Sequence, residues 1–255
     1  MRGLRLFNSR MVNEIKGKAT PNPYEKSRLV IQAYHDLEKS NLLTQSPTIQ
    51  RASQRLILVL TPSLLSTCSL CLRDISQAYV QSSTKLNREI IAKPPAEIAS
   101  QMPENSVLKI LKPLYGIPEA GTHWYNTYHK HHCEKLFMKT STYDPCLLIS
   151  DKKEIFGLVG MQTDDTLILG NKNFILLEND EIINANLLAK PIQTLSSENP
   201  LVFNGCILTF DEKDKSIKLL QKDQGKRIEL IDDKLLTYKQ DYFICRCTKS
   251  KSNKI

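Results

Sequence analysis

The chain has 255 residues and a mass of 29.1 kDa, which suits one large domain or two small ones with a real hydrophobic core. Hydrophobic residues make up 41% and charged residues 24%, so the composition excludes a disordered or collagen-like chain. The longest apolar stretch, 56–65, is too short to cross a bilayer, and residues 1–10 lack the apolar core of a secretory signal. We therefore expect no membrane association and an intracellular protein, in the cytoplasm, the nucleus or both.

Charge and cysteine content indicate the kind of partner and the redox state of the thiols. The net charge is +8, and residues 1–60 hold ten lysines and arginines against four acids, a balance that favours a polyanionic partner. Seven irregularly spaced cysteines indicate reduced thiols rather than a disulfide framework. Cys68-x-x-Cys71 has no second pair at zinc-finger distance, and its apolar surroundings predict a buried strand.

The first half of the chain predicts strands around one helix. Residues 26–34 read as a strand, and Ser46-Pro47 predicts the start of a helix that ends after Leu60. Three short apolar runs follow and predict further strands at 69–75, 89–93 and 107–111.

The second half predicts two helices and two hairpins. Residues 119–136 and 171–188 read as helices, the first of them amphipathic. Residues 154–170 form two apolar arms around Gln-Thr-Asp-Asp, which predicts a β-hairpin with carboxylates at its tip. A second hairpin is expected from strands at 201–210 and 216–221. This order predicts an α+β fold with antiparallel pairs, neither a doubly wound sheet nor a barrel.

The candidate chemistry is acidic, because the sequence has no glycine-rich phosphate loop, nucleophile elbow or HExxH pair. Asp74 ends a predicted strand, and Asp164 and Asp165 lie at a predicted hairpin tip. Three converging carboxylates repel one another unless a divalent cation binds between them, and two such cations can promote phosphoryl transfer. An Asp-Asp pair at a hairpin tip is, on its own, more often turn chemistry.

Longer motifs around these aspartates resemble a known family. In order and spacing, they resemble the reverse transcriptase of copia-type LTR retrotransposons, and the fungal members most closely. The resemblance covers about residues 10–231 and rests on 26–30 (KSRLV), 73–80 (RDISQAYV), 114–125 (LYGIPEAGTHWY), 143–148 (YDPCLL), 161–170 (MQTDDTLILG), 204–207 (NGCI) and 220–222 (LQK).

This resemblance implies the fingers and palm of a right-hand polymerase, with a mainly antiparallel sheet backed by helices. It implies RNA-directed DNA synthesis on an RNA or DNA template-primer, with deoxynucleoside triphosphates as substrates. Asp74, Asp164 and Asp165 match the family's catalytic aspartates, which hold two magnesium ions, with manganese as the alternative.

The same resemblance assigns nucleotide-binding roles to four further residues. Tyr79 matches the aromatic residue that closes the sugar pocket against a ribose 2′-hydroxyl. Lys26 and Arg28 resemble the basic fingers residues that meet the triphosphate. Glu119 stands where many relatives carry glutamine, and an acid at this position would repel phosphate.

The resemblance also implies a domain division. Residues 1–231 are expected to be a partial fingers and palm, and residues 232–255 a divergent tail in place of the thumb and RNase H region. Other parts of a pol polyprotein are then expected as partners. The alternative is a catalytically inactive, truncated remnant that at most binds nucleic acid.

Overall fold

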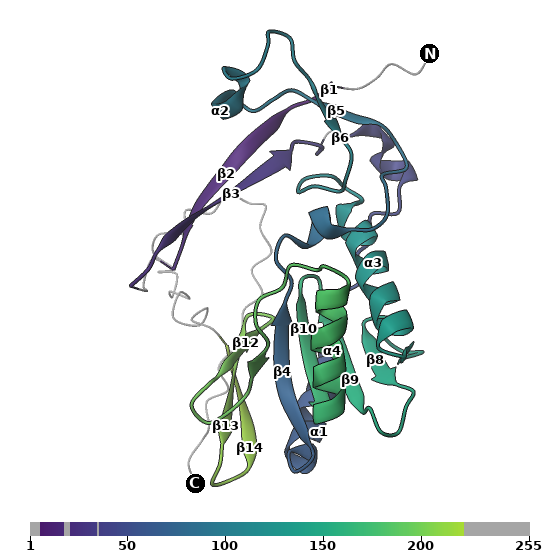
Figure 1. The fold of residues 1–255 in the computed structure, drawn as a ribbon, viewed down its shortest axis with the longest axis vertical. Helices are drawn as coiled ribbons and strands as arrows, with labels where there is room; N and C mark the ends of the chain where they lie inside the picture. Colours follow the sequence, from purple (N-terminus) through teal and green to yellow (C-terminus); the bar gives the residue numbers. More distant parts are fainter. Residues whose placement is uncertain (1–5, 18–20, 35, 222–255) are drawn as a thin grey trace, which may run out of the picture. The chain divides into compact units, whose positions relative to one another are not determined.

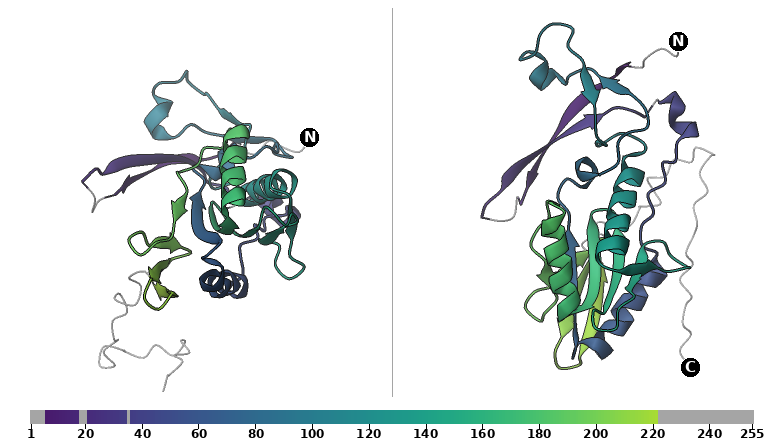
Figure 2. Two further views of the ribbon diagram at one scale, coloured as in Figure 1. Left: turned by 60° about the horizontal axis from the view of Figure 1, so that its bottom comes forward. Right: turned by 45° about the vertical axis from the view of Figure 1, so that its right-hand side comes forward.

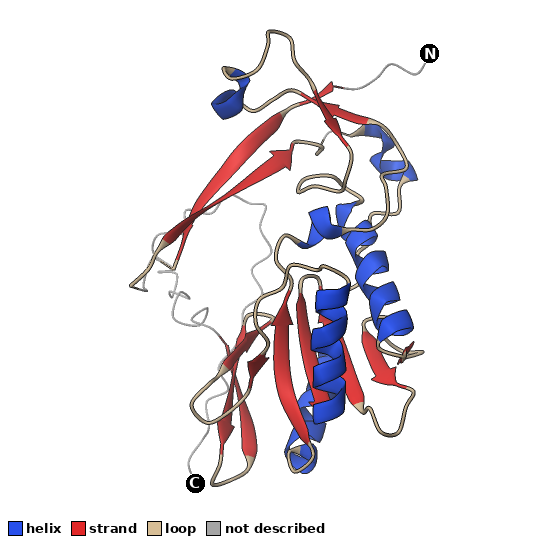
Figure 3. Ribbon diagram, in the orientation of Figure 1, coloured by secondary structure: helices blue, strands red, loops and turns tan. Residues whose placement is uncertain are grey.

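The computed structural model describes residues 6–17, 21–34 and 36–221, so the tail expected at 232–255 lies outside the described part. The described chain is a mixed α/β fold with few helices and mainly antiparallel sheets (Figures 1 and 3). This confirms the expected α+β class. No helix in these ranges is both long and apolar enough to span a membrane.

The largest sheet, called the main sheet below, has six strands that pair antiparallel. Its central strands are nearly all apolar because both faces of the sheet are covered by helices. In spatial order the strands are β11 (Gln193–Thr194), β4 (Cys68–Asp74), β10 (Asp165–Asn171), β9 (Gly157–Gln162), β8 (Leu147–Ser150) and β7 (Met138–Thr140).

Helices pack closely on both faces of the main sheet (Figure 2). On one face, a Cβ at Gly160 would lie 2.3 Å from the side chain of Ile49, just before α1 (Arg51–Leu64). On the other face, a Cβ at Gly157 would lie 2.5 Å from the ring of Phe174 in α4 (Lys172–Asn184). Glycine at these sheet positions thus lets the helices approach the strands. Helix α3 (Ala120–Lys135) also contacts the α4 face, where Thr166 of β10 donates a hydrogen bond to the Tyr128 hydroxyl.

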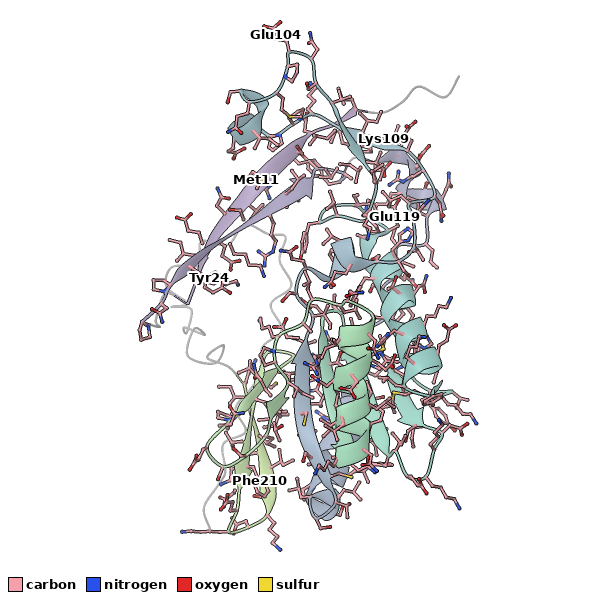
Figure 4. All side chains as sticks on the ribbon, in the orientation of Figure 1. Met11, Tyr24, Glu104, Lys109, Glu119 and Phe210 are labelled. Carbon is pink, nitrogen blue, oxygen red and sulfur yellow. The ribbon has the colours of Figure 1, made fainter. Side chains whose placement is uncertain are left out.

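A second group of strands, called the N-terminal strands below, has a core of its own. Two of its strands form a long antiparallel hairpin, and Figure 4 shows Tyr24 near the turn end of that hairpin. The second core includes Phe7, Ile31 and Ile90. The strands are β1 (Leu6–Phe7), β5 (Ile90–Ala92) and β6 (Leu108–Ile110) in one sheet, and β2 (Ser9–Lys16) and β3 (Tyr24–Ile31) in the hairpin.

The remaining elements are short. They are the 3-10 helices η1 (Leu37–Asn41) and η2 (Ala78–Gln81), the single-turn α2 (Ala96–Ala99), and a three-stranded sheet of β12 (Leu201–Phe203), β13 (Cys206–Asp211) and β14 (Ser216–Gln221).

Three details of the expected elements are wrong: the start of α1, its end, and the strand at 201–210. Helix α1 begins at Arg51 rather than at Pro47, because the backbone N–H of Gln50 bonds the carboxylate of Asp144, 94 residues away in the sequence. The helix also continues past Pro62 to Leu64. The expected single strand 201–210 is two strands, since Asn204 and Gly205 both adopt positive φ and form a tight turn.

The buried strand expected around Cys68 and Cys71 is confirmed. Cys68 and Cys71 are buried free thiols on β4, as expected for a buried strand.

Candidate active site

The three predicted aspartates come together at one end of the main sheet. Asp74 is the last residue of β4 and Asp165 the first of β10, and the two are direct cross-strand partners. Directly opposed residues in an antiparallel pair have Cα atoms about 5 Å apart. Asp164 precedes Asp165 in the hairpin turn, and its carbonyl accepts a 2.9 Å hydrogen bond from the N–H of Ile75. The fold therefore groups carboxylates that are 90 residues apart.

The turn that carries Asp164 is held by helix α3. The hairpin closes through the two residues Thr163 and Asp164, and Thr163 adopts a positive φ of 53°. A β-branched residue is strained in this region, so neighbouring contacts must impose the conformation. The buried Trp124 of α3 donates a 2.7 Å hydrogen bond from Nε1 to the Thr163 carbonyl. The indole thus helps fix the position of Asp164.

The negative charges of the three aspartates are only partly compensated by positive charges nearby. Burial, followed by repulsion from Asp164 and Asp74, raises the pKa of Asp165 to about 6. The pKa of Asp164 is also raised, mainly because its carboxyl is partly removed from water. The negative charge of Asp74 raises it further. A positive charge entering this site would relieve the repulsion between these carboxylates.

Lys190 already supplies one positive charge to the group. Its Nζ donates to Oδ2 of Asp74, and its backbone N–H donates a 2.9 Å hydrogen bond to the Asp74 carbonyl. The Lys190 side chain is 52% exposed and that of Asp74 is 27% exposed, so this ion pair stays open to water. Solvent screening keeps such a pair weak.

A buried ion pair fixes the backbone beside these residues. Arg73 donates to both carboxylate oxygens of Glu178 in α4, at 2.9 and 2.6 Å, and both side chains are almost fully buried. Its remaining nitrogen donates to the carbonyl of Lys190 at 2.9 Å. Arg73 therefore joins β4, α4 and the loop that carries Lys190.

Tyr79 lies close to the aspartates. It belongs to η2, is partly buried, and packs against both the core of the main sheet and the core of the N-terminal strands. Burial is the main cause that raises the pKa of its phenol, and the negative charge of Asp164 adds to this effect. The tyrosine is thus within electrostatic range of the hairpin turn.

Lys26 and Arg28 share one half-buried face of β3. Lys26 acts on the site from this face, because its charge lowers the pKa of Asp164 against the larger effect of burial. It forms no ion pair with the residues that the structure describes. Arg28 instead donates a 3.0 Å hydrogen bond to Glu14 on β2, and its guanidinium carbon lies 5.6 Å from the ring centre of Tyr115.

Glu119 lies at the start of α3, where Figure 4 labels it, and its side chain is buried. Arg88 donates to its two carboxylate oxygens at 2.7 and 2.9 Å, and also lies 2.6 Å from Asp36. Burial lowers the pKa of Arg88, but the hydrogen bonds to these acids outweigh it and raise the pKa overall. The charge of Glu119 is therefore compensated within the protein.

The donor chemistry of Asp74, Asp164 and Asp165 suits a hard divalent cation, since carboxylate oxygens are the ligands that magnesium prefers. Their mutual repulsion, seen in the raised pKa values of Asp164 and Asp165, is what a bound cation would remove. In the conformation described for residues 6–221, apart from its gaps, no three His, Cys, Asp or Glu side chains group closely enough to hold a metal. Lys190 meanwhile engages Asp74.

Sequence reasoning missed three residues that shape this region. Trp124 holds the hairpin turn, Lys190 pairs with Asp74, and Arg88 neutralises Glu119. Each acts on a partner 31 to 116 residues away. No local pattern marks such pairs, although Trp124 lies inside a motif that was already singled out.

Comparison with known proteins identifies the family. A family model described as "Reverse transcriptase (RNA-dependent DNA polymerase)" matches residues 2–198, which is well over half of the chain. A comparison with curated proteins found no match.

Proposed function

The chain belongs to the reverse transcriptase (RNA-dependent DNA polymerase) family, and on this premise we propose that Asp74, Asp164 and Asp165 form its active site. A primer would be extended there with deoxynucleoside triphosphates on an RNA or DNA template. The cross-strand pairing of Asp74 with Asp165, beside Asp164 in the adjoining turn, is the observation that carries the proposal.

Metal ions complete this proposal. The three carboxylates would hold two magnesium ions, or manganese in their place. Such ions, when bound, activate the attacking hydroxyl and stabilise the leaving oxygen. Among the chain's own groups, Lys26 is free of described ion pairs and offers its charge to the triphosphate, and Tyr79 closes the sugar pocket. The pairing of Lys190 with Asp74 supports a cation-binding role for that carboxylate.

The proposal extends to the architecture. We assign the main sheet with α1, α3 and α4 to the palm, and the N-terminal strands to the fingers. The two separate hydrophobic cores support this division. The ordered motifs around Asp74, Asp164 and Glu119 support a copia-type retrotransposon as the source, with Gln162-Thr163 favouring the fungal kind.

Primer extension tests the proposed activity. Purified protein is incubated with a primed homopolymer, the complementary deoxynucleotide and magnesium, with a parallel reaction in EDTA. We expect magnesium-dependent extension, and a fall of at least about 1,000-fold in Asp164→Asn, as for loss of a central catalytic group. Asp180→Asn, an exposed aspartate on α4, is the matched control and should extend normally.

Two results would count against this function. Extension that survives Asp164→Asn would remove the aspartates from the chemistry. The absence of extension by the unchanged protein, together with strongly salt-dependent binding of the primed template, would favour a non-catalytic nucleic-acid binder. The basic first 60 residues are the feature that supports this second function.

A further inference from the structure

Tyr79 is placed where the two cores of the protein meet. It packs against buried residues of the main sheet and against those of the N-terminal strands. The chain reaches it from Asp74 through Gln77, which adopts a positive φ of 52°. Because the ring is only partly buried, its orientation depends on the side chains that contact it.

Tyr115 is one such side chain. The ring centres of Tyr79 and Tyr115 are 5.0 Å apart, and the ring planes are tilted by 57°. Tilted aromatic pairs at this separation attract one another beyond the area that they bury. The orientation of the Tyr79 ring is therefore coupled to that of Tyr115.

The backbone of Tyr115 is fixed to the end of β3. Its carbonyl accepts a 2.8 Å hydrogen bond from Ile31, and the residue forms a parallel bridge with Val30. The next residue, Gly116, has a φ of +85°, and a Cβ there would lie 1.9 Å from the Ile31 carbonyl oxygen. Only glycine permits this close approach, so the loop holds Tyr115 against β3.

The ring of Tyr115 is also contacted by Arg28 of β3. The guanidinium carbon lies 5.6 Å from the ring centre, within the range of a cation–π interaction. Glu14 of the neighbouring strand in turn holds Arg28 at 3.0 Å. A continuous series of contacts thus leads from the β2–β3 hairpin through Tyr115 to Tyr79.

We propose that Tyr115 is a positioning residue for sugar selection: it holds the Tyr79 ring in the orientation that excludes a ribose 2′-hydroxyl. The proposal rests on the sugar-pocket role proposed above for Tyr79. Rejection of the 2′-hydroxyl by steric overlap needs a Tyr79 ring that cannot move aside. Tyr115 supplies one of the contacts that keep the ring in place. In the competing account, Tyr115 only fills the space between the two cores.

The test compares the efficiency of single-nucleotide extension with a deoxynucleotide and with the matching ribonucleotide. The proteins are the unchanged chain, Tyr79→Ala, Tyr115→Ala, Tyr115→Phe and the Tyr79→Ala/Tyr115→Ala pair. Tyr125→Ala is the matched control, because Tyr125 is another partly buried tyrosine whose hydroxyl bonds the Pro145 carbonyl. Melting temperatures are measured for all of them.

We expect Tyr79→Ala to lower the preference for deoxynucleotides most, and Tyr115→Ala to lower it by about 10-fold. Tyr115→Phe should keep the preference, because the ring contact remains. The double variant should match Tyr79→Ala alone, since Tyr115 acts through Tyr79. Tyr125→Ala should lose stability with no change in preference. If Tyr115→Ala does not fold, Tyr115→Leu removes the ring while keeping apolar bulk, and its preference should fall likewise.

The failures are distinguishable. An unchanged preference in Tyr115→Ala or Tyr115→Leu, beside a lowered one in Tyr79→Ala, overturns this inference and leaves the proposed function intact. An unchanged preference in Tyr79→Ala, or no extension by the unchanged protein, overturns the proposed function of the site and this inference with it.

Discussion

Asp36 and Glu119 share a partly buried arginine, whereas Asp74, Asp164 and Asp165 have only the half-exposed Lys190 as an ion-pair partner among the described residues. In the first group the Arg88 side chain is 12% exposed and donates to both carboxylates of Glu119 and Asp36. In the second group burial and mutual repulsion raise the pKa of Asp165 to about 6.

The difference is one of charge compensation, which is complete in the first cluster and partial in the second. A buried acid with a fixed cationic partner has its charge satisfied inside the fold. Acids that repel one another without such a partner destabilise the fold until an external cation binds. This contrast supports the proposed metal site at the sheet end, and it is consistent with a structural role for the Arg88 network.

The largest expected effect is the loss of Arg88. Arg88→Met leaves the carboxylates of Asp36 and Glu119 buried without their cation, so we expect the free energy of unfolding to fall by about 3–5 kcal/mol. Urea unfolding measures this, and Arg51→Met, at an exposed arginine, should change it little. Adding Glu119→Gln to Arg88→Met should restore part of the loss. A loss below about 1 kcal/mol would mean that the network is not structural.

The second prediction concerns pH and Asp165. A pKa raised in the folded state means that the folded protein binds this proton more tightly than the unfolded chain does. The charged form therefore destabilises the fold above pH 6, and the penalty disappears below the ordinary aspartate value of 3.8. Because Asp165 is partly exposed and solvent screens its charge, Asp165→Asn should stabilise the protein without divalent cations by only about 1–2 kcal/mol at pH 7.5, and by nothing near pH 3.5. An equal gain at both pH values would contradict this account.

A smaller effect is expected at Lys190. Because an exposed ion pair contributes up to about 1 kcal/mol, Lys190→Met should lower the half-saturating magnesium concentration for extension by up to about 5-fold. Lys172→Met, at an exposed lysine on α4, is the control. A higher magnesium requirement would instead show that Lys190 assists the reaction and does not compete with the cation.

The smallest effect is expected at Glu119. Since Arg88 already neutralises this carboxylate, Glu119→Gln should change the KM for the deoxynucleotide by less than about 3-fold. Steady-state extension at varied nucleotide concentration measures it. A fall in KM beyond about 10-fold would show that Glu119 acts on the nucleotide as an uncompensated acid.

Much of the fold follows from local patterns in the sequence. The apolar runs of β4, β9 and β10 and the carboxylates at the hairpin tip are set by neighbouring residues, and the structure has them as expected. The start of α1 was misplaced because Asp144 bonds Gln50 from a distant loop. The local Ser46-Pro47 pattern that predicted a helix start carries no information about that distant contact.

Of the candidate site, only the acidic residues could be predicted from the sequence. Asp74, Asp164 and Asp165 were marked by motif resemblance, and strand pairing then brings them together. The positively charged side chains that pair with acids in this region could not be predicted, because Lys190 and Arg88 meet their partners only in the tertiary structure. The compensated state of Glu119 therefore has no signature in the sequence.

Manganese binding tests the contrast between the two clusters most directly. Titration of the protein with Mn²⁺ in the presence of a primed template, followed by electron paramagnetic resonance, reports the bound ion whether or not extension occurs. We predict binding by the unchanged protein and by Glu119→Gln, and a loss of affinity of at least about 10-fold in Asp164→Asn and Asp165→Asn. Binding that is unaffected by both aspartate changes, or lost in Glu119→Gln, would contradict the assignment of the metal site to the sheet end.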